Sequence, residues 1–180
     1  MAAPDPLLSD WRSFYSVIAS SAAALTGLTF VVIALAPEKP LRSSGLRVFM
    51  TPTVIHFSSA LGIAAVLSMP GHSATSLAAC LCAGGLIGVI YSFTTTARMY
   101  RGRVNYPPAA SDWIWNAILP CLCYLAMLDS AALVLMRPAL ALYVIGTTAL
   151  MLVFVGIHNV WDMAVWLITR REPTRPRDPD

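Results

Sequence analysis

The chain has 180 residues, of which 57% are hydrophobic and only 12% are charged, with a formal net charge of +3. Soluble domains carry about a quarter charged residues, so this composition excludes an ordinary water-soluble fold. The basic residues lie beside long apolar runs, which argues against a nucleic-acid partner and for a lipid bilayer as the surrounding medium.

Five apolar runs are each long enough to form a membrane helix, which needs about 20 mostly apolar residues. We therefore expect an all-α integral membrane protein with five transmembrane helices in one bundle within residues 1–169. The tail, residues 170–180, is rich in proline and charge and is expected to be disordered and cytoplasmic. The predicted helices cover residues 14–36, 46–69, 77–97, 113–136 and 139–168.

Small residues recur at helical spacing in the first and third runs. Small residues let helix backbones approach closely in lipid, where no hydrophobic force drives helices together. The pattern predicts packing within the bundle or, alternatively, a seam between copies of the chain. The residues are Ser20, Ala24 and Gly27 in the first run, and Gly84, Gly88 and Ser92 in the third.

The second and fifth runs each hold one histidine. At 1.5 Å of rise per residue, His56 is expected about 15 Å from the cytoplasmic end of its helix, and His158 about 16 Å. Asp162 follows His158 at the i,i+4 spacing of a side-chain pair, and Asn159 is adjacent to it. Asp129, in the fourth run, is expected closer to the outer side.

Ionisable groups inside a membrane are costly, so these residues are the candidate functional site. We expect a polar cluster of His56, His158 and Asp162 in the bundle interior, near the midplane. Such a cluster could relay protons, respond to pH or line an ion path. The alternative is that each group only makes an interhelical hydrogen bond.

Two histidines at one depth also allow a bis-histidine haem b held by His56 and His158, since haem iron accepts axial histidines. Apart from that possibility no cofactor is expected. The sequence offers no further ligands for a metal site. It contains no phosphate-binding loop, dinucleotide fingerprint or hydrolase motif, so nothing in it favours an enzyme.

The basic residues fall on one side of the predicted bundle. The side with the N-terminus has only Arg12 and Arg137. Because short loops rich in Lys and Arg stay cytoplasmic, we expect the N-terminus outside and the C-terminus in the cytoplasm. The other side has Lys39, Arg42, Arg47, Arg98, Arg101, Arg103, Arg170, Arg171, Arg175 and Arg177.

Two segments, Ala23-Ala24-Leu25-Thr26-Gly27-Leu28-Thr29-Phe30-Val31 and His158-Asn159-Val160-Trp161-Asp162, resemble runs in small multi-spanning proteins of the bacterial inner membrane. The resemblance covers about two helices and implies that location, but it brings no activity with it.

Three functions are compatible with these features. The leading hypothesis is a homo-oligomeric channel or transport-related protein of the bacterial inner membrane, because small-residue faces accompany a polar cluster. The second is a membrane scaffold or regulator that binds another membrane protein through those faces. The third is an electron carrier with haem b.

Overall fold

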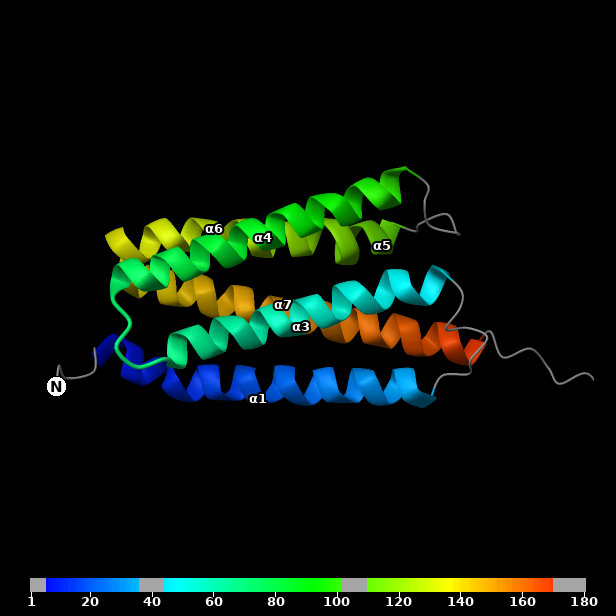
Figure 1. Ribbon diagram of the computed structural model, residues 1–180, viewed down its shortest axis with the longest axis horizontal. Coiled ribbons are helices and arrows are strands. Elements are labelled where there is room, and N and C mark those ends of the chain that lie inside the picture. Colours follow the sequence, from blue (N-terminus) through cyan, green and yellow to red (C-terminus); the bar gives the residue numbers. More distant parts are fainter. Residues whose placement is uncertain (1–5, 36–43, 102–109, 170–180) are drawn as a thin grey trace, which may run out of the picture.

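The structure, a computed structural model, describes residues 6–35, 44–101 and 110–169, and the secondary structure of these residues is helical throughout. A short α5, a π-helical turn η1 and α6 follow one another directly and form one continuous helix. The successive long helices run antiparallel along the longest axis of the molecule (Figure 1). Their bounds are α1 Pro6–Leu35, α3 Ser44–Ser68, α4 Ala74–Tyr100, α5 Ala110–Trp113, η1 Ile114–Ile118, α6 Leu119–Met136 and α7 Pro138–Thr169.

Four helical stretches are long and apolar enough to cross a membrane. They belong to α1, to α4, to the continuous α5–η1–α6 helix and to α7. In α3, the apolar part found among the described residues, Pro52–Ser68, is shorter, so a fifth span stays a prediction. The four stretches are Asp10–Ala34, Ala74–Tyr100, Ala110–Met136 and Pro138–Val165. The expected tail at 170–180 lies outside the described residues.

The turn between α3 and α4 is closed by local chemistry. Gly71 has φ +76°, in the left-handed region that glycine adopts without steric cost. Two residues later, the Ser73 side chain accepts from the Ser76 backbone N–H at 3.1 Å, and the Ser76 side chain accepts from the Ser73 N–H at 3.1 Å. This reciprocal capping box satisfies backbone donors at the start of α4 and fixes where the helix begins.

The π-helical turn has a cause in the sequence. Pro120 has no N–H to donate to the Asn116 carbonyl, and its ring would crowd that carbonyl in a regular α-helix. The chain responds by widening the turn before it, so that the Leu119 N–H reaches the Ile114 carbonyl five residues back. A kink is expected near Pro120 from the sequence; a π turn is the form that the distortion takes.

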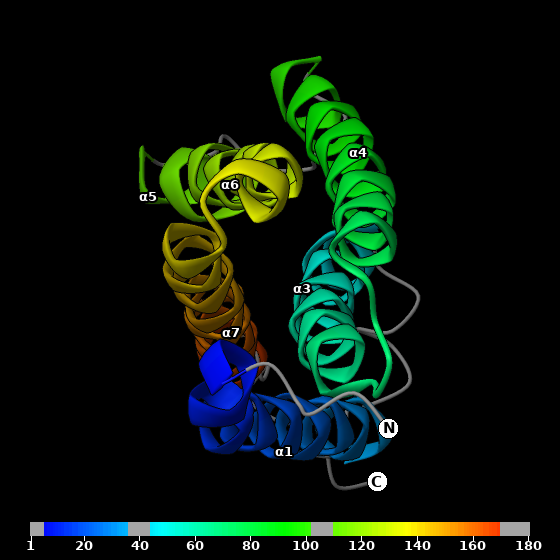
Figure 2. The ribbon, with the colours of Figure 1, turned by 90° about the vertical axis from the view of Figure 1, so that its left-hand side faces the viewer.

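The helices form a ring when viewed along their axes (Figure 2). α4 packs chiefly on α6, α6 also packs on α7, and α3 packs on both α7 and α1. By contrast α3 and α4, although joined by the short turn, make few contacts with each other. The ring therefore has one loosely packed side, between α3 and α4.

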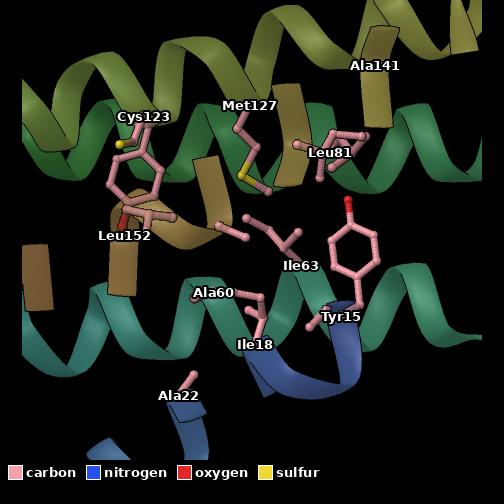
Figure 3. Close-up of a cluster of buried hydrophobic side chains, with 14 of the residues drawn as sticks. Tyr15, Ile18, Ala22, Ala60, Ile63, Leu81, Cys123, Met127, Ala141 and Leu152 are labelled. Carbon is pink, nitrogen blue, oxygen red and sulfur yellow. The ribbon is translucent and has the colours of Figure 1, made fainter. Parts of the chain in front are cut away.

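Buried apolar side chains from every long helix meet inside this ring. In Figure 3, Ile63 of α3, Leu81 of α4 and Met127 of α6 point into the same space, while Tyr15 reaches up from α1. The outer surface is also apolar, with large side chains such as Leu28, Ile87 and Phe154 at least half exposed. An exposed apolar surface this extensive marks a region covered by lipid or protein.

Candidate functional site

The centre of the polar site is Tyr124, a residue of α6 that joins three helices. Its ring lies directly against Gly88 of α4, where an added Cβ would overlap the ring. Its hydroxyl is 3.0 Å from His56 Nδ1 and 3.1 Å from Ser59 Oγ, both on α3. Tyr124 is only 1% exposed, so these hydrogen bonds are buried. They join α6 to α3, while the ring of the same residue packs on α4.

The three groups form a hydrogen-bonded chain that can run in either direction. If His56 Nδ1 accepts, the Tyr124 hydroxyl donates to it and Ser59 donates to Tyr124. If His56 Nδ1 carries the proton, each donation is reversed, and Tyr124 donates to Ser59. Hydroxyl groups both donate and accept, so one concerted rearrangement interconverts the two arrangements. This property is what a proton relay requires.

Two further buried polar groups, one on α3 and one on α7, have atoms without a hydrogen-bond partner among the described residues. They are His56 Nε2 and both side-chain polar atoms of Asn159. Each of the two residues is 1% exposed. A buried polar group without a hydrogen bond costs free energy, so these atoms are suited to bind water or a polar ligand inside the bundle.

The side of α7 on which Asn159 lies follows from helix geometry. Gly156 faces α3, because an added Cβ there would overlap the Phe57 ring. At about 100° per residue, Asn159 is about 60° from the direction of Gly156 and also faces α3, whereas His158 is about 200° away. Asn159, rather than His158, therefore faces α3, the helix that holds His56.

His158 and Asp162 form the expected pair, with Nε2 to Oδ2 at 3.1 Å. Their side chains are 28% and 40% exposed, and the His158 ring stacks on Trp115 of η1 with centroids 4.0 Å apart. Among the described residues, no interaction joins this pair to His56. The cluster expected in the sequence is thus divided between a buried junction and a half-exposed pair, because adjacent positions on α7 face different ways.

The other candidate residues also lie in different environments, some exposed and some buried between helices. Asp129 is exposed on α6, at two residues from the buried Met127 and so on another face. Gly88 and Ser92 are buried between helices, and Gly84 is partly buried. Ser20, Ala24 and Gly27 lie on the exposed face of α1, where a Cβ at Gly27 would meet nothing within 4 Å.

A groove of about 200 Å³ opens between α3 and α4, next to the polar junction. Met127 of α6 lines it from within the bundle. Gly62 and Cys80 are exposed, so the groove is accessible from the outer surface of the bundle. The lining consists of Ser59, Gly62, Ile63 and Val66 from α3, Cys80, Leu81 and Gly84 from α4, and Met127.

Tyr124 is the functional candidate that the sequence analysis missed. A signal was available: the residue lies near the middle of the fourth apolar run, 113–136, where a phenolic hydroxyl needs a hydrogen-bond partner. Attention to ionisable groups alone overlooks hydroxyl groups that connect them. Ser59, by contrast, shares a helix face with His56, so the sequence does indicate that it could extend the polar cluster.

Neither the residues nor the comparisons identify a cofactor or a family. Within the described part of the chain, no three His, Cys, Asp or Glu side chains gather as metal ligands would. Of the two histidines proposed for haem b, His56 contacts the Tyr124 hydroxyl and His158 stacks on Trp115. Comparison of the chain with family models, with curated proteins and with solved structures gives no match.

Proposed function

We propose that this chain is a transport-related protein of the bacterial inner membrane that relays protons through the junction of His56, Tyr124 and Asn159. One observation carries the proposal: a reversible hydrogen-bonded chain ends at a buried imidazole nitrogen that has no hydrogen-bond partner among the residues that the structure describes. Water bound between that nitrogen and the Asn159 carboxamide would extend the chain toward α7. Intramembrane polar groups commonly mark such pathways.

The proposed topology has five transmembrane helices, the N-terminus outside and the C-terminus in the cytoplasm. The distribution of basic residues supports it, because Arg12 and Arg137 lie at one end of the bundle and Arg98 and Arg101 at the other. Reporters fused to the two termini should respond in opposite compartments. Two reporters active in the same compartment would contradict the five-span arrangement.

We further propose that the protein self-associates. A single ring of helices has little room for a conducting path, and ionisable side chains on its exterior need cover in lipid. Asp129 is exposed, and the exposed face of α1 holds Ser20, Ala24 and Gly27. Close packing of α1 against another copy is the contact that small residues permit. Substitution Gly27→Leu should reduce the oligomer measured by native mass spectrometry in detergent.

Proton flux into proteoliposomes tests the relay. Tyr124→Phe removes one hydroxyl and keeps the ring on Gly88, so it should abolish flux while leaving the fold intact. His158→Ala is the matched control, because His158 faces another side and should leave flux unchanged. Flux that survives Tyr124→Phe, or flux lost only with His158→Ala, would exclude the proposed path.

A second candidate is a membrane scaffold or regulator that binds a different membrane protein. The exposed small-residue face of α1 favours it, because Gly27 leaves open space for a partner helix. This function predicts no proton flux and a co-purifying partner that is lost in Gly27→Leu. A partner retained by that variant would reject α1 as the binding face.

A further inference from the structure

We propose that the groove between α3 and α4 binds a neutral aliphatic molecule bearing one hydroxyl group, which enters sideways from the bilayer. The inference goes beyond the proposed proton relay, since such binding does not require that the protein conduct. It names the chemistry of a ligand that neither the sequence analysis nor the relay assigns.

The lining sets the polarity of this ligand. Seven of its eight residues offer apolar or thiol surface, and none of the eight is charged. Cavities of roughly this size with apolar walls stay dry and take up small apolar molecules instead of water. A charged headgroup would lose its hydration without gaining a partner, so the ligand is neutral and mostly hydrocarbon.

Ser59 supplies the one hydroxyl group of the groove lining. The hydrogen bonding of this hydroxyl determines which polar group the ligand must carry. In the described part of the chain this hydroxyl makes a single hydrogen bond, to Tyr124 at 3.1 Å. When Ser59 donates to Tyr124, it can still accept from the groove; when it accepts from Tyr124, its own proton is free to donate. A ligand hydroxyl, being both donor and acceptor, satisfies Ser59 in both arrangements.

The position of the groove explains the direction of entry. Ser59 and Val66 are separated by seven residues on α3, or about 10 Å along the helix, so the groove runs from the polar junction toward the turn between α3 and α4. Gly62 and Cys80 are exposed at its rim. A molecule dissolved in the bilayer can therefore reach Ser59 with its hydroxyl foremost.

Photolabelling of the full chain in lipid nanodiscs tests the site. The probe is a dodecanol bearing a diazirine on its chain, and the matched control is dodecane with the diazirine at the same carbon. Mass spectrometry of peptides should place the alcohol on α3 and α4 around Gly62 and Cys80. Labelling there should exceed that by the alkane roughly fivefold, the effect of one neutral hydrogen bond.

Two variants separate the parts of the proposal. Gly62→Leu places a larger side chain at the groove, at a position where an added Cβ meets nothing within 4 Å, and should remove the label. Ala97→Leu, at an exposed position near the other end of α4, should not. Ser59→Ala should cancel the advantage of the alcohol over the alkane. Labelling that is unchanged by Gly62→Leu would overturn the site, and equal labelling by both probes in the wild type would overturn the hydroxyl requirement.

The labelling needs no ion gradient, so its outcome is independent of the flux measurement. Groove labelling without flux in the wild type would reject the relay and keep the ligand site. Flux that depends on Tyr124, without groove labelling, would keep the relay and reject the ligand site.

Discussion

The two interfaces of α4 use glycine for opposite purposes. Toward α6, Gly85 lets the Leu128 backbone approach so closely that a Cβ would lie 2.8 Å from its nitrogen. Toward α3, Gly84 lines an open groove, and its Cβ would meet only the mobile end of Met127, 2.6 Å away. A difference of one residue, about 100° around the helix, separates a close helix contact from a ligand-sized space.

The comparison teaches that a small residue in an apolar helix does not define what lies opposite it. In lipid, a missing side chain permits close backbone contact where a neighbouring helix can approach. The short turn at Gly71 holds the ends of α3 and α4 together, yet α4 packs on α6 instead. Tyr124 then spans the remaining distance to α3 through its hydroxyl.

The largest loss of stability is expected where the backbones of α4 and α6 are in contact. Gly85→Ala places a methyl group against the Leu128 main chain, which cannot move unless α4 and α6 separate. Overpacking of this kind costs about 1–3 kcal/mol, so the unfolding midpoint in an SDS–detergent titration should fall. Gly27→Ala, with open space around it, is the control. An unchanged midpoint for Gly85→Ala would mean that the two helices are less closely packed.

A smaller loss of stability is expected when the Tyr124 hydroxyl, which connects α6 with α3, is removed. Tyr124→Phe keeps the ring on Gly88 but leaves His56 and Ser59 without their shared partner. A lost neutral hydrogen bond costs about 1 kcal/mol. The double variant Tyr124→Phe with Ser59→Ala should cost less than the sum of the two single changes, because both remove the same bond. Additive losses would show that the 3.1 Å contact is not formed.

Gly84→Ala should lower the stability less than either of these changes. The only atoms near the added methyl group belong to the Met127 side chain, whose flexible thioether can turn aside. We expect the SDS unfolding midpoint to stay close to that of the wild type, in contrast with Gly85→Ala one position away. A loss as large as that of Gly85→Ala would indicate that the Met127 side chain cannot turn aside.

Much of the helical architecture could be predicted from the apolar runs. Each run lies almost entirely within a helix, and α4, predicted at 77–97, extends by a few residues at both ends. Periodicity and length determine helices directly, because the backbone must satisfy its own hydrogen bonds in an apolar medium. The start of α1 at Pro6 was not anticipated, since Asp10 and Arg12 lie before the apolar run.

The site could be predicted only in part. The position of a residue along its helix follows from the sequence, but the neighbouring helix that its side chain faces does not. The sequence places His56 and Asn159 as polar residues within apolar runs, and both are buried in the structure. His158 was grouped with them by depth, but it turns toward Trp115. The facing side of α7 depends on Gly156 admitting Phe57, a contact between distant segments that no local pattern reveals.

The only gain in stability among these substitutions is expected on the open side of α3, at the groove. Gly62 lies within α3 at the rim of the groove, and an added Cβ meets nothing within 4 Å. Alanine restricts the unfolded chain and favours helix, so Gly62→Ala should raise stability by about 0.4–1 kcal/mol. The SDS unfolding midpoint should rise, while the same substitution at Gly85 lowers it. A fall at Gly62 would mean that α3 and α4 close on each other in the membrane and that the groove is not a standing feature of the bundle.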